Sequence, residues 1–158
     1  MKKTWKDYTF VLLQALLIGA FFVPVSWRFE LPLPGLYYLN SFLMGMGLVV
    51  VVLGFMHLRT NLTPFPTPKT KSHLVTSGIF SQVRHPIYTG LFLLFAGWAL
   101  RGENLYQLLI AAALLLLFFF KSQYEERQLD KRFPQYEKYK ARTGRFIPKL
   151  GKSFARNN

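Results

Sequence analysis

The sequence predicts an all-α integral membrane protein with about four transmembrane helices, the last two joined as a tight hairpin, and a cytosolic C-terminal helical segment. Three observations support this fold class. Of the 158 residues, 51% are hydrophobic and 17% are aromatic. The apolar residues gather in four blocks, at 8–25, 36–58, 87–100 and 105–120, and lack the dispersed periodicity of a soluble core. The basic residues fall almost entirely on one side of a four-crossing arrangement of these blocks.

The first two blocks are long enough to cross a bilayer, which takes about 20 residues. Block 8–25 contains Gln14 and no charged residue, and it ends without the small-residue pattern of a cleaved signal peptide, so we expect a retained helix. In block 36–58, Gly47 and Gly54 are seven residues apart and share one helical face. Small residues on one face predict close packing against another membrane helix.

A connector at 61–86 follows the second helix. Prolines at 64, 66 and 68 exclude a helix there and favour an extended segment, either a rigid spacer or a strap over a site. Pro86 suits the first turn of the third helix, where a missing N–H costs nothing. Arg84 and His85 therefore precede a helix start, where free N–H groups favour an anionic group.

The last two blocks are separated only by residues 101–104, which predicts a helical hairpin, either fully spanning or shallow. The fourth helix should continue to about Phe133, where Pro134 blocks it. Residues 135–142 then read as a short surface helix capped by Gly144. We expect one membrane domain over 1–158, divided into 1–60, 61–86, 87–120 and a site-closing segment at 121–150.

The charge distribution predicts the orientation in the membrane. The net charge is +13, and all of the 20 lysines and arginines except Arg28 and Arg101 lie on the side of both termini. The positive-inside rule then places both termini in the cytoplasm, and we expect the inner membrane of a bacterium or archaeon. Attraction to anionic lipid explains the basic tail better than nucleic acid, for which no motif is present. With no cysteine and no dense ligand spacing, no metal site is expected.

Two polar groups should meet on the cytoplasmic side. Arg84-His85-Pro86 stands at the base of the third helix, and Glu125-Glu126 stands beyond the membrane end of the fourth. Because the hairpin between them is short, both return to the same side. The alternative is that Arg84 anchors the helix at the interface, His85 caps it, and the two carboxylates balance nearby lysines and arginines on a solvated helix.

Two ordered motifs extend these groups. They are Leu74-Val75-Thr76-Ser77-Gly78-Ile79-Phe80-x3-Arg84-His85-Pro86-x-Tyr88-x-Gly90, and Glu125-Glu126-x2-Leu129-x3-Phe133-Pro134-x-Tyr136-x2-Tyr139. In this membrane setting, the pattern resembles the isoprenylcysteine carboxyl methyltransferases and the related phospholipid methyltransferases. The resemblance covers about residues 74–148.

The resemblance implies a site for S-adenosylmethionine without a Rossmann fold, in a cytosolic pocket that the C-terminal segment closes and a lipid acceptor enters from the bilayer. The cofactor contacts that it implies are Ser72, His73, Leu74, Val75, Phe80, His85, Pro86, Tyr88, Glu125 and Glu126. Phe80 stands where the family commonly has tyrosine. Lys121 falls where eukaryotic carboxyl methyltransferases place an arginine near the substrate carboxylate, and a lysine keeps the charge without the bidentate geometry. Lys121 and Arg84 are the candidate catalytic residues.

The predicted function is therefore methyl transfer from S-adenosylmethionine to a membrane-embedded, lipid-like or prenylated acceptor, a carboxylate such as that of a prenylcysteine-like substrate. Three alternatives stand beside it. They are a phospholipid N-methyltransferase, a membrane sterol-type reductase that uses NADPH, and a non-catalytic membrane protein that binds anionic lipid.

Overall fold

The computed structural model describes residues 3–30, 36–69 and 72–149. Within these ranges the chain is helical, with no strand. The five α-helices are α1 Trp5–Phe21, α2 Leu36–Leu58, α3 Pro86–Arg101, α4 Leu105–Arg132 and α5 Tyr136–Arg142. Of two 3₁₀ turns, η1 Arg59–Asn61 directly follows α2, and η2 Gly78–Ser81 lies in the connector. Residue 150, the predicted end of the site-closing segment, lies outside the described ranges.

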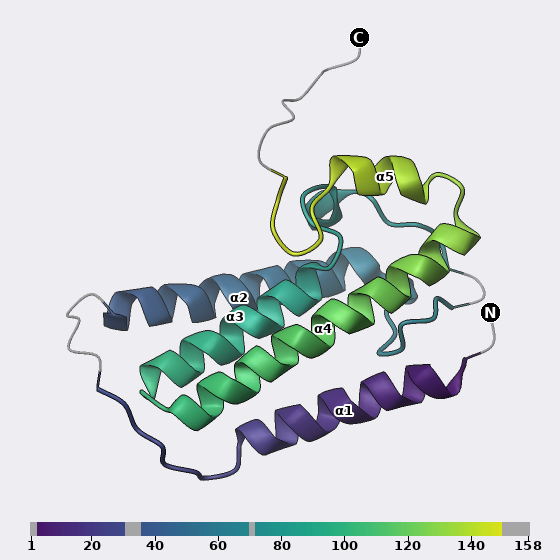
Figure 1. Cartoon of the computed structure of the whole chain (residues 1–158). Helices are drawn as coiled ribbons and strands as arrows, with labels where there is room; N and C mark the ends of the chain where they lie inside the picture. Colours follow the sequence, from purple (N-terminus) through teal and green to yellow (C-terminus); the bar gives the residue numbers. More distant parts are fainter. Residues whose placement is uncertain (1–2, 31–35, 70–71, 150–158) are drawn as a thin grey trace.

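The four long helices lie side by side in the order α1, α4, α3, α2, and successive helices along the chain run in opposite directions (Figure 1). The start of α1, the end of α2, the start of α3 and the end of α4 therefore meet at one end, which we call the site end. The connector and α5 cover this end (Figure 1). The opposite end holds the turn between α3 and α4, and we call it the hairpin end.

The hydropathy blocks predict most helix boundaries. α2 has the predicted bounds, α3 begins with Pro86 at its first position, and α4 ends one residue before Phe133. At the start of α4, the Asn104 side chain accepts a hydrogen bond from the Gln107 N–H at 3.2 Å, as an N-cap residue does. α1 begins earlier than predicted, at Trp5, and ends at Phe21, because Pro24 disfavours helical backbone just before it.

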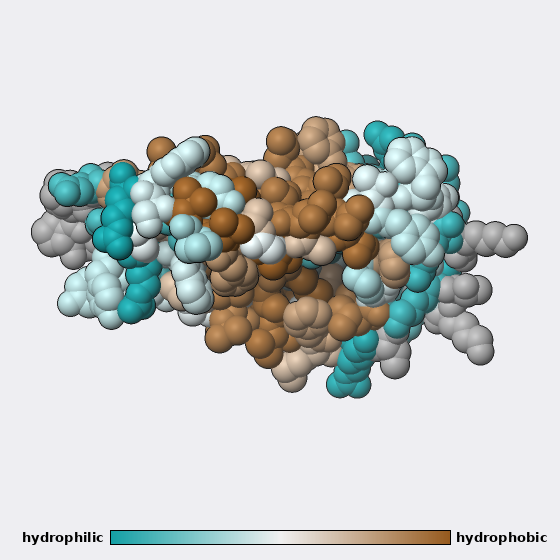
Figure 2. Space-filling view, turned by 90° about the horizontal axis from the view of Figure 1, so that it is seen from below, coloured by the Kyte–Doolittle hydropathy of each residue, from teal (hydrophilic) through white to brown (hydrophobic). Residues whose placement is uncertain are grey.

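Among the helices of the described ranges, α2 and α4 are long and apolar enough to span a membrane. Large apolar side chains such as Leu48, Val49 and Phe120 are more than half exposed on the outside of the bundle. On the face in Figure 2, a hydrophobic band separates two hydrophilic ends. α1 and α3 have 17 and 16 residues. At 1.5 Å per residue each is only about 25 Å long, so four full crossings stay a prediction.

Glycines set the distance between α2 and α3. A Cβ atom on Gly47 would lie 2.7 Å from the Gly90 carbonyl oxygen, and a Cβ on Gly90 would lie 2.7 Å from the Gly47 carbonyl oxygen. Seven residues further along each helix, Gly54 meets Ile87 and Gly97 meets α2 at similar distances. The close packing that the glycine spacing predicts is therefore confirmed, and α3 is the partner helix.

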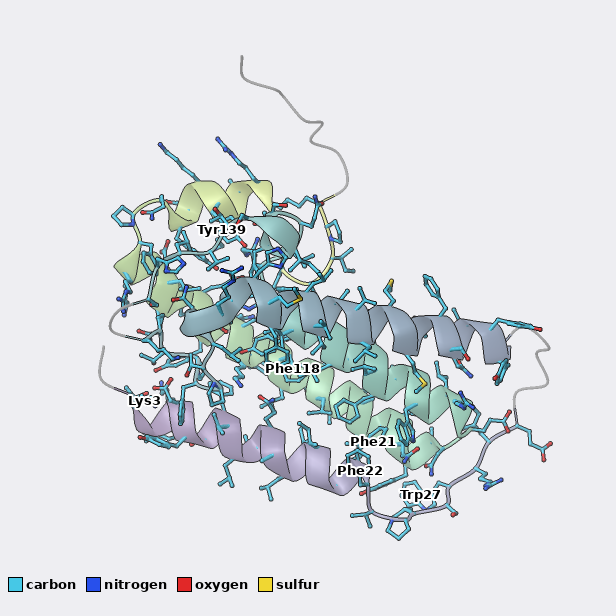
Figure 3. The ribbon with its side chains drawn as sticks, turned by 180° about the vertical axis from the view of Figure 1, so that it is seen from behind. Lys3, Phe21, Phe22, Trp27, Phe118 and Tyr139 are labelled. Atoms are coloured by element: carbon cyan, nitrogen blue, oxygen red, sulfur yellow. The ribbon has the colours of Figure 1, made fainter. Side chains whose placement is uncertain are left out.

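The hairpin end is held by hydrogen bonds and aromatic rings. The loop after α1 pairs with the turn after α3, because the Phe29 N–H donates to the Glu103 carbonyl at 3.0 Å and the Leu105 N–H donates to the Trp27 carbonyl at 2.7 Å. Phe21 packs edge to face on Phe95, with ring centroids 4.7 Å apart. Figure 3 shows Phe21, Phe22 and Trp27 gathered here, with Lys3 at the site end.

The C-terminal segment departs from the predicted helix cap. Gly144 does not have the positive φ of a left-handed cap residue, so the prediction that it caps α5 is wrong. Instead, Thr143 leaves the helix with extended backbone, and Gly144 forms an isolated parallel bridge with Val83. This pairing redirects the chain across the start of α3.

Candidate functional site

Two adjoining cavities lie at the site end. The larger, which we call the helix cavity, has a volume of about 280 Å³ and is lined by all four long helices and the connector. The smaller, the connector cavity, has a volume of about 90 Å³ and lies against the connector, the end of α4 and α5. The two share one wall, made by Leu58, Thr63, Phe80, Arg84 and Glu125.

The connector holds Phe80 in this shared wall. Gly78 has a φ of +60° and lies so close to the His57 ring that a Cβ there would overlap it. His57 in turn bonds through Nδ1 to the Leu53 carbonyl at 2.7 Å. On the other side, the Tyr139 hydroxyl donates to the Phe80 carbonyl at 2.6 Å. His57 therefore has a packing role at the end of α2.

The proline-rich stretch forms a strap, residues 63–68, along both cavities. Thr63 and Pro64 line the helix cavity, and Pro66 and Pro68 line the connector cavity. The strap is fixed to α1 because the Thr67 N–H donates to the Asp7 carboxylate at 2.8 Å. Of the two alternatives that the sequence left open for this stretch, its position along both cavities favours the strap, and the site beneath it stays a prediction.

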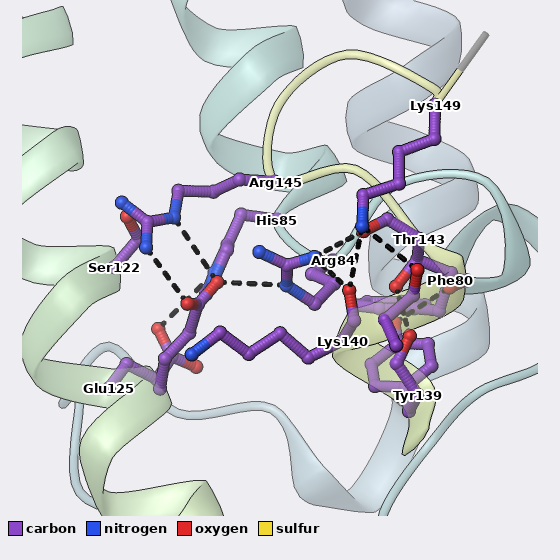
Figure 4. Close-up of polar contacts among 12 residues, drawn as sticks. Phe80, Arg84, His85, Ser122, Glu125, Tyr139, Lys140, Thr143, Arg145 and Lys149 are labelled. Carbon is purple, nitrogen blue, oxygen red and sulfur yellow. Dashed lines mark hydrogen bonds and ion pairs between the residues drawn. The ribbon is translucent and has the colours of Figure 1, made fainter. Parts of the chain in front are cut away.

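A buried polar cluster holds the C-terminal segment to the bundle. We call Arg84, His85, Glu126 and Arg145, together with backbone 143–146, the clasp. The Glu126 carboxylate accepts from Arg84 Nε at 2.9 Å and from Arg145 Nη2 at 2.9 Å, and it lies 3.2 Å from His85 Nε2. Figure 4 shows Arg84, His85 and Arg145 converging. A carboxylate buried at 3% exposure is stable only with partners of this kind.

The backbone completes the clasp. The Arg84 N–H donates to the Gly144 carbonyl at 2.9 Å, and the His85 N–H donates to the Arg145 carbonyl at 3.0 Å. The Arg84 guanidinium also donates to the Thr143 carbonyl. These two N–H groups before α3 are therefore occupied, and the anion at this helix start is the Glu126 side chain.

Glu125 faces the cavities instead. It accepts a hydrogen bond from the Tyr88 hydroxyl at 3.0 Å, and His85 Nδ1 lies 3.7 Å away. The His85, Tyr88 and Phe118 rings form one stack, with interplanar angles of 3° and 7°. This stack fixes the Tyr88 hydroxyl toward Glu125, while the rest of the half-buried carboxylate faces the cavity walls.

Lys121 lies one turn before Glu125 on the same wall of the helix cavity, as their four-residue spacing predicts. Its side chain is 1% exposed. The Nζ atom donates to Gln14 Oε1 at 2.6 Å and lies 5.3 Å from the centre of the Tyr88 ring. Among the described residues, no carboxylate oxygen lies within 4 Å of it.

Most of the predicted site residues lie around these cavities. The helix cavity is lined by Phe80, Arg84, His85, Pro86, Tyr88, Lys121 and Glu125. The connector cavity is lined by Ser72, His73, Leu74 and Val75, together with Phe80, Arg84 and Glu125. Glu126 lines neither cavity and lies in the clasp.

Several residues around the two cavities and the clasp were not predicted. Three of them, Gln14, Arg145 and Tyr136, carry polar groups. Gln14 is the one amide in an otherwise apolar run of α1, which is a signal that the sequence did offer. Tyr136 lies within the second motif. Nothing in the pattern singles out Arg145 among the basic residues of the tail.

The Tyr136 hydroxyl has no hydrogen-bond partner among the described residues, although the side chain is only 1% exposed and lines the connector cavity. Burial, reinforced by the negative charge of Glu126, raises the pKa of Tyr136 far above its ordinary value. The hydroxyl therefore keeps its proton and is a buried donor without a partner among the described residues, on a side chain that borders the connector cavity. A buried donor left unpaired is costly, which fits a ligand site.

Comparison with known proteins identifies the family. The model of the phospholipid methyltransferase family matches residues 35–136, which include α2, the connector, α3, α4 and the first residue of α5. No curated protein matches the sequence closely enough to count as a relative. The matched region contains the shared wall of the two cavities, and α1 and Arg145 lie outside it. The chain therefore belongs to the phospholipid methyltransferase family and is a membrane methyltransferase that acts on lipid-like substrates.

Proposed function

We propose that the protein transfers a methyl group from S-adenosylmethionine to a lipid-like acceptor that carries a carboxylate, such as a prenylcysteine-like substrate. One observation carries the proposal. Two cavities meet at Glu125: one extends between apolar helices and contains a buried cation, and the other lies under a polar connector with an unpaired donor. Such a pair of cavities suits a reaction between one apolar and one polar molecule.

The residues around the connector cavity fit the cofactor. S-adenosylmethionine is rich in hydrogen-bonding groups and carries a positive sulfur. Glu125 supplies a carboxylate to the shared wall, and Tyr136 supplies an unpaired hydroxyl donor. Ser72, His73, Leu74 and Val75 add the backbone and side chains of the opposite wall. We assign the polar parts of the cofactor to this region.

The chemistry requires little from the protein beyond placement. When bound, S-adenosylmethionine supplies a methyl group on a sulfonium, so transfer to a carboxylate forms a C–O bond, breaks the S–C bond and leaves a neutral ester and a neutral thioether. The nucleophile is already ionised, and no strong base is needed. Lys121 would hold the acceptor oxygen and Arg84 would keep the clasp shut, so that alignment and exclusion of water provide the acceleration.

The apolar part of the helix cavity suits the acceptor chain. Phe55, Ile87 and Leu91 line it from α2 and α3. In the orientation that the basic residues favour, the site end faces the cytoplasm. The acceptor would then lie in the bilayer half nearest the cofactor supply.

A phospholipid N-methyltransferase is the second candidate, because the matching family is described by phospholipid methylation. An ammonium headgroup would have to lose a proton before it attacks. Glu125 or His85, which lie beside the helix cavity, would then act as the base.

Ligand-dependent melting of the purified chain in detergent tests the cofactor assignment. We expect S-adenosylhomocysteine to raise the melting temperature and NADPH to leave it unchanged. Stabilisation by NADPH alone would instead favour the reductase alternative. If neither ligand shifts the melting temperature, both the methyltransferase and the reductase hypotheses are contradicted.

Labelled-methyl transfer into extracted membranes tests the acceptor. A product that releases volatile label on treatment with base is an ester and supports a carboxylate acceptor. A base-stable lipid product would support N-methylation.

A further inference from the structure

We propose that Gln14 and Lys121 together form a subsite for an anionic oxygen group of the acceptor, and that Gln14 determines specificity for it. The inference rests on the proposed function for the identity of the reaction, and on the geometry of α1 and α4 for the site itself. The ligand chemistry is a carboxylate or phosphate oxygen at the head of an apolar chain.

The hydrogen bond between Lys121 and Gln14 has a fixed direction. A lysine ammonium has three donors and no acceptor, so only the carbonyl oxygen of Gln14 can face it. The 2.6 Å contact between Nζ and Gln14 Oε1 therefore turns the Gln14 amide N–H groups away from Lys121. No hydrogen bond from these N–H groups forms among the described residues. Gln14 and Lys121 both line the helix cavity, so they bring an ammonium and an amide with N–H groups unpaired among the described residues to the wall of a space that Glu125 also lines.

The charge of Lys121 has no direct ionic contact among the described residues. Lys121 is buried, and its polar partner is a neutral amide. The nearest carboxylate along its helix, Glu125, is already bonded to the Tyr88 hydroxyl and lies beside His85. Glu125 attracts the ammonium from one helical turn away, but among the described residues no carboxylate oxygen lies within 4 Å of Lys121 Nζ, so an anionic ligand group would supply the direct ionic contact that is missing.

Gln14 comes from a helix outside the region that the family shares. The family match begins at residue 35, so α1 lies outside the matched region. α1 nevertheless packs along α4 and is tied to the strap through Asp7 and Thr67. It therefore brings one amide to a cavity whose other polar groups come from the matched region. A residue outside the matched region is better suited to select the acceptor than to take part in a step that the whole family shares.

Binding of a matched pair of probes to the full-length protein in detergent tests the subsite. The probes are N-acetyl-S-farnesylcysteine and its uncharged carboxamide. We expect the carboxylate to bind the wild type about tenfold tighter than the carboxamide, because one charge-assisted contact distinguishes them. In Gln14→Glu the new carboxylate pairs with Lys121, so this preference should disappear. Gln123→Glu, on α4 and outside both cavities, adds the same charge and should retain it.

A Gln14→Glu variant that keeps the tenfold preference overturns the inference. If this variant does not fold, Gln14→Leu tests the Gln14 amide by itself, and an unchanged preference there contradicts the role of Gln14 in specificity. S-adenosylhomocysteine binding is measured separately on each protein. If S-adenosylhomocysteine does not bind the wild type, the proposed function is contradicted. A preference for the carboxylate probe that depends on Gln14 would still support the anion subsite.

Two further probes separate the sources of the anionic group. Short-chain phosphatidic acid that binds with the same Gln14 dependence assigns a phosphate headgroup to the subsite. Displacement of the farnesyl probe by inorganic phosphate assigns a free anion. If neither phosphate probe binds, the subsite is assigned to a carboxylate.

Discussion

The clasp and the helix cavity use two adjacent carboxylates in opposite ways. Glu126 is buried, and Arg84, His85 and Arg145 surround it. Glu125 is half-buried, accepts one hydrogen bond from a neutral hydroxyl and faces both cavities. Successive residues on a helix point about 100° apart, so a pair of glutamates necessarily serves two surroundings. From this comparison we propose that Glu126 stabilises the C-terminal segment and that Glu125 binds ligand.

The largest effect should come from breaking the clasp with Glu126→Gln. The change removes the carboxylate that balances two guanidinium groups and His85. Loss of one partner from a buried ionic cluster destabilises by about 3–5 kcal/mol, which corresponds to a fall in melting temperature of roughly 10 °C. Thermal unfolding in detergent measures it. A melting temperature within error of the wild type would show that Glu126 does not hold the segment.

The matching change in the cavity, Glu125→Gln, should separate binding from stability. We expect S-adenosylhomocysteine to bind about tenfold more weakly, because a charged contact becomes a neutral one, while the melting temperature without ligand stays near that of the wild type. Glu137→Gln on the exposed side of α5 is the control. Unchanged affinity would remove Glu125 from the cofactor site.

A pair of tyrosines sharpens the contrast. Tyr136→Phe removes a hydroxyl without a partner among the described residues, so affinity for S-adenosylhomocysteine should fall about fivefold with no loss of stability. Tyr139→Phe removes the bond to the Phe80 carbonyl, so the melting temperature should fall by about 3 °C. Calorimetry and titration on both variants distinguish the roles. The reverse pattern would exchange the two assignments.

The smallest effect should come from Phe80→Tyr, which adds a hydroxyl at the wall that both cavities share. One additional hydrogen bond to a ligand should tighten S-adenosylhomocysteine binding about threefold. Phe119→Tyr, on a more exposed face of α4 and outside both cavities, should leave affinity unchanged. Weaker binding in Phe80→Tyr would mean that the ligand fills the space beside this ring.

Much of the fold could be predicted because hydropathy acts locally. Block 36–58 has the same bounds as α2. Pro86 marks the start of α3, and Pro134 follows the end of α4, because proline fits the first turn of a helix and interrupts its interior. The shared end of Arg84 and Glu125 followed from the shortness of the α3–α4 turn. The cap at Gly144 was predicted wrongly, since the pairing of Gly144 with Val83 depends on a partner 61 positions earlier in the chain.

The rest of the site depends on which helices become neighbours. The contact of Gln14 with Lys121 exists because α1 lies against α4, and hydropathy does not determine helix order within a membrane bundle. Arg145 reaches Glu126 only after the chain reverses beyond α5. The division of labour between Glu125 and Glu126 likewise requires knowing what each one faces.

The strap at 63–68 has little conformational freedom left to lose when a ligand binds. Its alternating prolines each hold φ near about −65°, and the Asp7 contact fixes the segment at Thr67. A ligand therefore meets a rim whose backbone entropy was already lost when the chain folded. The binding free energy then reflects the contacts made, with little subtracted for ordering a loop.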